Sequence, residues 1–491
     1  MISLALLVLL SSTDELAVDR SPTGPQLTVI EAVERRSAAL EEASKRIWEM
    51  AELALEEHRS AELLAVMVES EGFRVKRGVS DMPTAFVAEW GSGRPVIAFL
   101  AEYDALPGLS QKVVAEVVPR VAGGGGHGCG HNLFGAASTG AALALKEAMQ
   151  KHGLAGTVRL YGTPAEEQGI GKVFMVRDGL FEDVDACLSW HPSNQNKVNT
   201  QPSKALCSFE VRFHGRSAHA SGAPWEGVSA LDAVEAFGSG VNLLREHIPE
   251  TARIHYVVTE GGAAPNIVPS SARIWAFVRG KNWPEQDKVF RHVEAIVRGA
   301  DLMAWGEEYG NEKRGFQAAE ITRLTGLYDY NINQALGQCM HEAFETVGAP
   351  SFEDSEQQFG RELQRAFGFA ATGYQEDILP FDPSRKPEPG GSTDVANISW
   401  VAPTVDLNVA CWPIACPAHS WASTAASGYS AGRKGLRTAA KVLGVAGAIL
   451  LQDPSRLDPI RVEFERSRAR FDYSPAVGPD DSPGLPWHMR D

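Results

Sequence analysis

The residues whose types could do metal chemistry begin in a glycine-rich stretch, GGGGHGCGHNLFG, at residues 123–135. It places His127, Cys129 and His131 close together, directly before a run of small residues typical of a helix. A cysteine and a histidine two residues apart can direct a thiolate and an imidazole at one metal ion, and glycines let the backbone approach closely. A phosphate-binding loop or a plain turn has a similar glycine content, so the stretch alone leaves those alternatives open.

Further candidate side chains follow three apolar runs along the chain. They are Glu102 and Asp104, the adjacent pair Glu166 and Glu167, and His191. In α/β sheets, sites form at the carboxyl ends of the strands, so these groups are expected near the Cys-His loop. The glutamate pair alone has a simpler alternative, because carboxylates are favoured at the solvated start of a helix.

The elements that would position these groups are predicted from hydrophobic periodicity. Apolar residues at three- and four-residue intervals predict two helices over residues 27–72, the second ending at Gly72. A wholly apolar run at residues 95–100 is typical of a strand covered on both faces. Further strands are expected at 85–89, 156–161 and 184–191, with a helix at 136–151.

From about residue 205 to 317 the pattern changes. It predicts, in order, a strand, a helix, two strands, a helix and a last strand at residues 304–310. Two βαβ-like halves of this kind make an α+β sandwich of the ferredoxin-like type. Helices at 331–347, 355–367 and 422–451, with a strand at 404–410, then return to the first pattern.

The predicted fold is therefore α/β, a doubly wound catalytic domain interrupted by a smaller α+β domain. At 491 residues the chain is too long for one ordinary core, which agrees with this division. We expect the catalytic domain at residues 25–203 and 319–452 and the inserted domain at 204–318. The tail at 453–491, rich in Pro and Asp, is expected to be a loose terminal segment.

Composition narrows the classes of partner and compartment. Lys plus Arg is 46 against 62 Asp plus Glu, a net charge of −16, which argues against nucleic acid and anionic membrane as partners and favours a small molecule. Six scattered cysteines argue against a disulfide framework and favour a cytoplasmic location. Residues 2–10 (ISLALLVLL) resemble the apolar part of a signal peptide, so a secreted or periplasmic location is the alternative.

Seven motifs occur in an order and at separations that resemble one known family. They are GHGCGHN, TPAEEQGIGK, WHP, FHGRSAHASGAPWEGVSALDAV, GGAAPNIVP, PGGSTD and PAHSWA. Over about residues 30–450 the chain closely resembles the di-metal amidohydrolases related to aminoacylase, carboxypeptidase G and plant auxin-conjugate hydrolases. Within that family it is similar to the p-aminobenzoyl-glutamate hydrolase branch and its dipeptidase relatives. The resemblance implies a metallopeptidase-type catalytic domain with an inserted dimerisation, or lid, domain.

The resemblance also implies which residues hold two divalent metal ions. The implied ligands are Cys129, His131, Glu167, His191 and His419. Glu166 falls on the position of the general acid/base, which agrees with one carboxylate of the pair binding metal while the other accepts a proton. Asp104 matches a carboxylate that orients one ligand. One thiolate, one carboxylate and three imidazoles suit zinc, with manganese or cobalt as alternatives.

Two nearby residues keep an open role at this point. Many relatives have His-x-Asp where this chain has Glu102, Tyr103 and Asp104, and Cys129 is expected to compensate for that histidine. The role of Glu102 is therefore undetermined. His127 is either a substrate contact or a loop residue.

The substrate contacts implied by the resemblance come from two regions. His219, in the inserted domain, matches a histidine that reaches across a homodimer interface to stabilise the oxyanion. Asn266 and Arg279 match positions that hold the substrate's amide or carboxylate, and the planar fork of arginine suits both carboxylate oxygens. Gly391 and Ser392 could present backbone and hydroxyl donors to the same anion.

The function implied by these residues is hydrolysis of an N-acyl or N-aroyl amino acid, with p-aminobenzoyl-glutamate as the model substrate. Metal-activated water would attack the carbonyl, with Glu166 as general acid/base. A dipeptidase or an auxin-type conjugate hydrolase is the alternative within the family. A non-catalytic subunit that kept the fold is the alternative outside enzymes.

Overall fold

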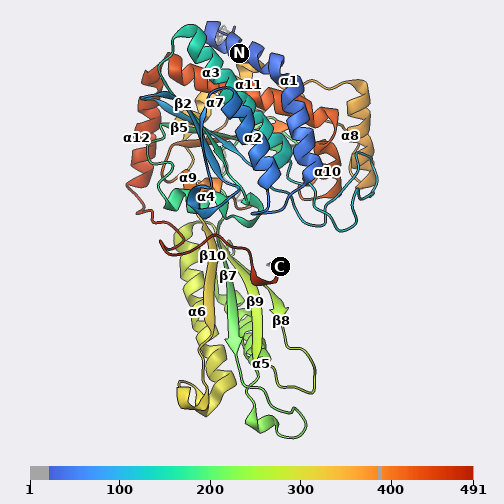
Figure 1. Ribbon diagram of the computed structural model, residues 1–491, viewed down its shortest axis with the longest axis vertical. Helices are drawn as coiled ribbons and strands as arrows, with labels where there is room; N and C mark the ends of the chain where they lie inside the picture. Colours follow the sequence, from blue (N-terminus) through green and yellow to red (C-terminus); the bar gives the residue numbers. More distant parts are fainter. Residues whose placement is uncertain (1–20, 385–389, 490–491) are drawn as a thin grey trace, which may run out of the picture.

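The computed structural model describes residues 21–384 and 390–489 of the chain, so the apolar segment at residues 2–10 lies outside the described part. Figure 1 shows a larger α/β body and a narrower one that extends from it, formed by the middle of the chain in green to yellow. Within the described ranges, no helix combines the length and apolar character needed to cross a membrane.

The larger body is built on a seven-stranded sheet in the order β1-β2-β4-β3-β5-β11-β6. Its strands are β1 (Arg74–Arg77), β2 (Phe86–Ser92), β3 (Val96–Ala101), β4 (Gly156–Gly162), β5 (Ala186–Ser193), β6 (Lys197–Val198) and β11 (Thr404–Ala410). The central strands β4, β3, β5 and β11 are parallel, and β1, β2 and β6 pair antiparallel at the two sides. Every residue of β3 is buried, as its apolar run predicts.

Helices surround this sheet, and α3 and α11 pack directly against its central strands while α1 lies against both helices (Figure 1). The helices of this body are α1 (Gly24–Met50), α2 (His58–Ser70), α3 (His131–His152), α4 (Gly171–Arg177), α7 (Gln334–Val347), α8 (Asp354–Ala366), α9 (Val395–Ile398), α10 (Trp421–Ser427), α11 (Ser430–Gln452) and α12 (Leu457–Arg468). The small side chains of α3 allow it to be buried along most of its length.

The inserted body is a four-stranded antiparallel sheet in the order β10-β7-β9-β8. It comprises β7 (Ala205–His214), β8 (Arg253–Glu260), β9 (Ser271–Gly280), β10 (Glu320–Leu327), α5 (Ala230–Leu244) and α6 (Trp283–Trp305). Both helices pack on the sheet around a core that includes Phe209, Phe213, Phe237 and Phe290. Buried and half-buried residues alternate along β9, as in a strand with one covered face.

Three predicted element boundaries are wrong. Residues 304–310 are not a strand, because α6 continues to the buried Trp305 and a short 3-10 turn follows. The fourth strand of the inserted sheet is instead β10, which pairs with β7, so this sheet extends beyond residue 318 to Leu327. The last predicted helix is two helices, because the chain turns at Gly428 against the ring of Trp48.

The C-terminal segment also differs from the loose tail that its composition predicts. After α12, the rings of Phe471 and Tyr473 pack against Tyr328 and the neighbouring aromatic residues at the junction of the two bodies. Further on, the backbone N–H of Trp487 donates to Glu210 of β7 at 2.8 Å. The segment therefore connects the two bodies, and Figure 1 shows it in red crossing their junction.

Candidate metal and active site

The Cys-His loop is pressed against the carboxyl end of the parallel sheet. A side chain at Gly126 would place its Cβ 1.9 Å from the carbonyl oxygen of Leu109, so only glycine fits there. Gly130 has a φ of +77° and lies against Pro192, at the end of β5. Helix α3 starts directly after it, at His131 rather than at the expected residue 136. The glycines thus bring Cys129 and His131 to the end of β5.

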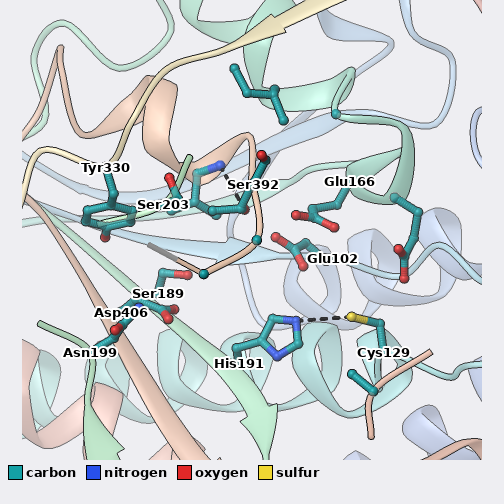
Figure 2. Close-up of a pocket in the computed structure, with 18 of the residues that line it drawn as sticks. Glu102, Cys129, Glu166, Ser189, His191, Asn199, Ser203, Tyr330, Ser392 and Asp406 are labelled. Atoms are coloured by element: carbon teal, nitrogen blue, oxygen red, sulfur yellow. Dashed lines mark hydrogen bonds between the residues drawn. The ribbon is translucent and has the colours of Figure 1, made fainter. Parts of the chain in front are cut away.

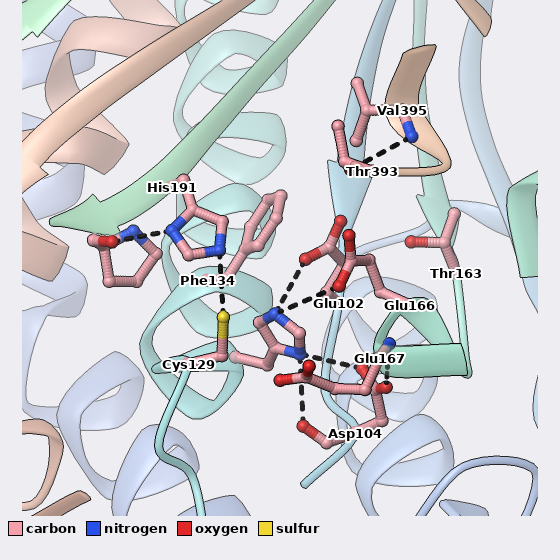
Figure 3. Close-up of polar contacts among 12 residues, drawn as sticks. Glu102, Asp104, Cys129, Phe134, Thr163, Glu166, Glu167, His191, Thr393 and Val395 are labelled. Atoms are coloured by element: carbon pink, nitrogen blue, oxygen red, sulfur yellow. Dashed lines mark hydrogen bonds and ion pairs between the residues drawn. The ribbon is translucent and has the colours of Figure 1, made fainter. Parts of the chain in front are cut away.

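One group of candidate ligands consists of Cys129, His131 and His191, whose donor atoms all lie within 4.8 Å of one another. Cys129 Sγ lies 3.4 Å from His191 Nε2, as Figure 3 shows. His191 Nδ1 is 2.6 Å from the carbonyl oxygen of Pro192, which assigns the proton to Nδ1 and leaves the Nε2 lone pair facing the thiol. His131 Nδ1 is 2.8 Å from Asp104 Oδ1, which fixes its tautomer in the same way.

A second group shares Cys129 and adds Glu167 and His419, again within 4.8 Å. His419 Nε2 lies 3.4 Å from Glu167 Oε2. The backbone N–H of Glu167 donates to Asp104 Oδ2 at 2.9 Å, so Asp104 holds one candidate ligand of each group. His419 has a φ of +56°, a left-handed conformation that is uncommon outside glycine, and its N–H donates to Gly128 O at 2.9 Å.

A third group contains Glu102, His131 and Glu166. His131 Nε2 lies 3.1 Å from Glu102 Oε2 and 3.9 Å from Glu166 Oε2 (Figure 3). The role of Glu102 is open from the sequence, and the structure brings it to the site. Ala165, which precedes Glu166, has a φ of +57°, so a strained turn directs the glutamate pair toward the histidine.

A buried lysine beside Glu102 is absent from the sequence analysis. Lys172 is 0% exposed, and its Nζ lies 2.8 Å from Glu102 Oε1 and 2.6 Å from Asp394 Oδ1. Burial opposes its charge, but Asp394 and Glu102 raise the pKa of Lys172 above its ordinary value. The signal in the sequence is a single lysine in the otherwise apolar run GIGKVFMV.

The atoms at this site fit divalent metal ions. Glu102 Oε2, His131 Nε2 and Glu167 Oε1 are buried with no hydrogen-bond partner. Burial raises the pKa of Glu167 to about 8, and burial followed by the carboxylates raises the pKa of Cys129. Lone pairs of thiol, imidazole and carboxylate that face one another need a cation between them, and this donor set is one that zinc accepts.

A cavity of about 660 Å³ opens beside these groups (Figure 2). The inserted domain contributes Phe277 and Arg279 of β9 to its lining, and the loop before α9 contributes Gly391 and Ser392. Burial lowers the pKa of Arg279, the direction expected for a desolvated cation. Arg279, Gly391 and Ser392 therefore lie at the cavity, as predicted for substrate contacts.

Three other candidates lie away from the cavity of their own chain. His219 and Asn266 lie beyond the end of the inserted sheet where His214 pairs with Ser271, opposite the end that carries Arg279. Neither side chain lines the cavity. His127 is buried with its Nε2 3.0 Å from the carbonyl oxygen of Ile47, and burial lowers its pKa to about 4. His127 thus anchors the loop to α1 and is not a cavity residue.

Comparison with known proteins agrees with this site. The model for peptidase family M20/M25/M40 matches residues 98–375. The B chain of the p-aminobenzoyl-glutamate hydrolase from Escherichia coli K12 is 35% identical over 462 residues, or 89% of this chain and 94% of that protein. The Xaa-Arg dipeptidase of Mus musculus is 29% identical over 456 residues, or 89% of this chain and 93% of that protein.

Two solved structures share the fold. One is an aminobenzoyl-glutamate utilization protein from Klebsiella pneumoniae, with a TM-score of 0.56 at 18% identity over 84% of this chain and 97% of that one. The other is a dinuclear metal-binding peptidase of the M20 family from Bacillus subtilis, with a TM-score of 0.55 at 19% identity over 86% and 99%. Because the family match spans more than half of its length, the chain belongs to peptidase family M20/M25/M40 and is a metal-dependent amidohydrolase.

Proposed function

We propose that the enzyme hydrolyses the amide bond of N-acyl or N-aroyl amino acids such as p-aminobenzoyl-glutamate, with two divalent ions, zinc in the first place. The observation that carries the proposal is the pair of ligand groups that share Cys129, next to a cavity that also holds an arginine. Cys129, His131 and His191 would hold one ion, and Cys129, Glu167 and His419 the other. The names of the relatives support an amide of this kind.

The bound ions would polarise the amide carbonyl and lower the pKa of a water molecule. Glu166 is the general acid/base in this proposal, because its carboxylate lines the cavity and is not needed in either ligand group. It accepts the proton of the attacking water and returns it to the leaving amine nitrogen. Asp104 holds the Nδ1 proton of His131 and so keeps its Nε2 available.

The substrate's carboxylate would bind Arg279, whose guanidinium offers two parallel N–H donors. Ser392 supports the same end, because its buried hydroxyl has no hydrogen-bond partner among the described residues and lines the cavity. Gly391 would add a backbone donor beside it. Phe277, next to Arg279, offers an apolar surface to the rest of the substrate.

His219 and Asn266 would act on the cavity of a second copy of this chain, in a homodimer formed through the inserted domain. Both lie at the end of this domain that is remote from their own cavity. Strand β8 is the edge of the inserted sheet and exposes Val257 and Val258, which suits an edge covered by a partner. Sedimentation at the mass of two chains is the expected result, and a monomer would contradict it.

The test is metal content of protein purified without added metal, together with hydrolysis of p-aminobenzoyl-glutamate before and after chelation. We expect about two ions per chain and chelator-sensitive release of p-aminobenzoate. Glu166→Gln should keep both ions and lower kcat by about 10²–10⁴-fold. Glu182→Gln, an exposed glutamate that does not line this cavity, is the control and should change neither quantity.

Loss of metal together with activity in Glu166→Gln would instead make Glu166 a ligand. Two ions without turnover of p-aminobenzoyl-glutamate would direct the assay to dipeptides and auxin-type conjugates. Protein that binds no metal and cleaves no amide would contradict the proposal and favour a non-catalytic subunit.

A further inference from the structure

One side of the cavity, away from the candidate metal ligands, is lined by polar groups that neither ligand group uses. Ser203 and Tyr330 lie there with buried hydroxyls that have no hydrogen-bond partner among the described residues. Asp406, Asn199 and Ser189 lie beside them, and Figure 2 shows these residues on the side of the cavity opposite Cys129 and Glu166. We call Asp406, Asn199, Ser189, Ser203 and Tyr330 the polar wall.

The position of the polar wall follows from strand register. Asp406 of β11 pairs with Ser189 of β5, and His191 lies two residues further along β5. Residues two apart on a strand face the same side, roughly 7 Å from each other. The Asp406 carboxyl therefore lies about one para-substituted benzoyl group behind the candidate metal ligand His191, on the same face of the sheet.

The chemistry of the polar wall selects a hydrogen-bond donor. Asp406 is held by the side chains of Ser189 and Asn199, and burial raises the pKa of this carboxyl to about 7. A ligand that offered only apolar atoms would leave the carboxyl and the hydroxyls of Ser203 and Tyr330 without new partners. A second carboxylate would be repelled by Asp406, although Lys197 of β6 lines the same side of the cavity and offsets part of the charge.

We propose that Asp406, positioned by Ser189 and Asn199, accepts hydrogen bonds from an amino group at the end of the substrate remote from the scissile amide. The inference rests on the proposed function and adds a specificity-determining residue to it. Arg279 of the inserted domain would hold the carboxylate end, while Asp406 of the catalytic sheet would hold the amino end. The amino group is either an arylamine or an alkylammonium, since both donate N–H bonds to a carboxylate.

The test compares three glutamate conjugates that differ only in the para group of the benzoyl ring: 4-amino, 4-aminomethyl and 4-methyl. We expect the wild-type enzyme, loaded with metal, to prefer at least one of the two amino substrates over the 4-methyl substrate by about tenfold or more in kcat/KM. A 4-amino group makes the carbonyl less reactive than a 4-methyl group does, so a preference for 4-amino would run against intrinsic reactivity. A higher value for 4-aminomethyl would assign a cationic ligand, and a higher value for 4-amino an arylamine.

Asp406→Asn should reduce this preference to less than about threefold while the 4-methyl substrate keeps most of its kcat/KM, because the amide no longer accepts as a charged group. Ser189→Ala provides a second variant if Asp406→Asn does not fold, and it should narrow the preference in the same direction. Asp458→Asn, an exposed carboxylate on α12, is the matched control and should leave the ratio unchanged.

The outcomes separate the two proposals. Equal kcat/KM for all three substrates, or an unchanged ratio in Asp406→Asn and in Ser189→Ala, would overturn the amino subsite and leave the proposed function standing. Failure of the metal-loaded wild-type enzyme to cleave any of the three would overturn the proposed function and the subsite with it.

Discussion

At the scale of single residues, His131 joins two buried networks. Its Nδ1 faces Asp104, and its Nε2 faces Glu102, whose other oxygen pairs with Lys172. Lys172 in turn pairs with Asp394, directly after the loop that lines the cavity. A series of charged contacts therefore runs from a candidate metal ligand to the cavity wall, and Lys172 supplies the positive charge between Glu102 and Asp394.

Removing Lys172 should destabilise the protein strongly. Lys172→Met leaves the buried Glu102 and Asp394 without their cation, so we expect the free energy of unfolding to fall by about 3–5 kcal/mol. Urea denaturation measures it, and Lys151→Met, an exposed lysine in α3, should change it by less than about 0.5 kcal/mol. Combining Lys172→Met with Asp394→Asn should cost less than the sum of the single variants, because the two groups interact. A strictly additive result would contradict the pairing.

At the scale of elements, the start of α2 supports the turn that carries Glu166 and Glu167. Glu57, the residue before α2, is buried and accepts a hydrogen bond from the backbone N–H of Ala165 at 2.8 Å. Burial, and then the nearby Asp104, raise the pKa of Glu57 to about 8. The folded protein therefore holds a proton on Glu57 that the unfolded chain has released by neutral pH.

This proton gives the metal-free protein a pH-dependent stability. Because the folded pKa of Glu57 is above its unfolded value, its contribution is fully present below pH 4.5 and is lost as the pH rises through about 8. Glu57→Gln should therefore gain stability relative to wild type between pH 5.5 and 8.5, by up to about 3 kcal/mol. Thermal unfolding with a chelator measures the difference, and the exposed Glu56→Gln should show none. An equal change at both pH values would mean that Glu57 is ionised throughout.

At the scale of the whole molecule, the inserted domain has one end at its own cavity and the other directed away from it. Arg279 lies at the near end, and His219 lies beyond the far end. The C-terminal segment spans the junction, where Tyr473 packs against Tyr328 and Trp487 contacts β7. This arrangement keeps Arg279 over the cavity and leaves His219 available to a second copy.

Mixed dimers test whether His219 acts in the partner's cavity. When Glu166→Gln and His219→Ala chains are co-expressed, random pairing should restore about one quarter of wild-type activity, because one cavity in each mixed dimer is intact. Each variant alone should be nearly inactive. Glu166→Gln co-expressed with Asp104→Asn should recover nothing, since both residues belong to the same cavity. Absence of recovery in the first mixture would place His219 outside the partner's site.

The sequence by itself determined the family, the types of the candidate metal ligands and the strands that carry them. This was possible because the loop around Cys129, the glutamate pair and the end of β5 are each local patterns, and the carboxyl ends of parallel strands meet at one edge of a sheet. Seven motifs in a fixed order added the rest of the ligand set. The buried run of β3 was also legible, because its apolar character is continuous.

Only the tertiary structure decided which groups meet across long separations. Lys172 and Asp394 are 222 residues apart, and no local periodicity encodes their contact with Glu102. The fourth strand of the inserted sheet, the polar wall around Asp406 and the docking of the C-terminal segment depend in the same way on pairing between distant elements. Local pattern fixes the faces of helices and strands, but register and packing choose their partners, because that free energy arises only when the elements come together.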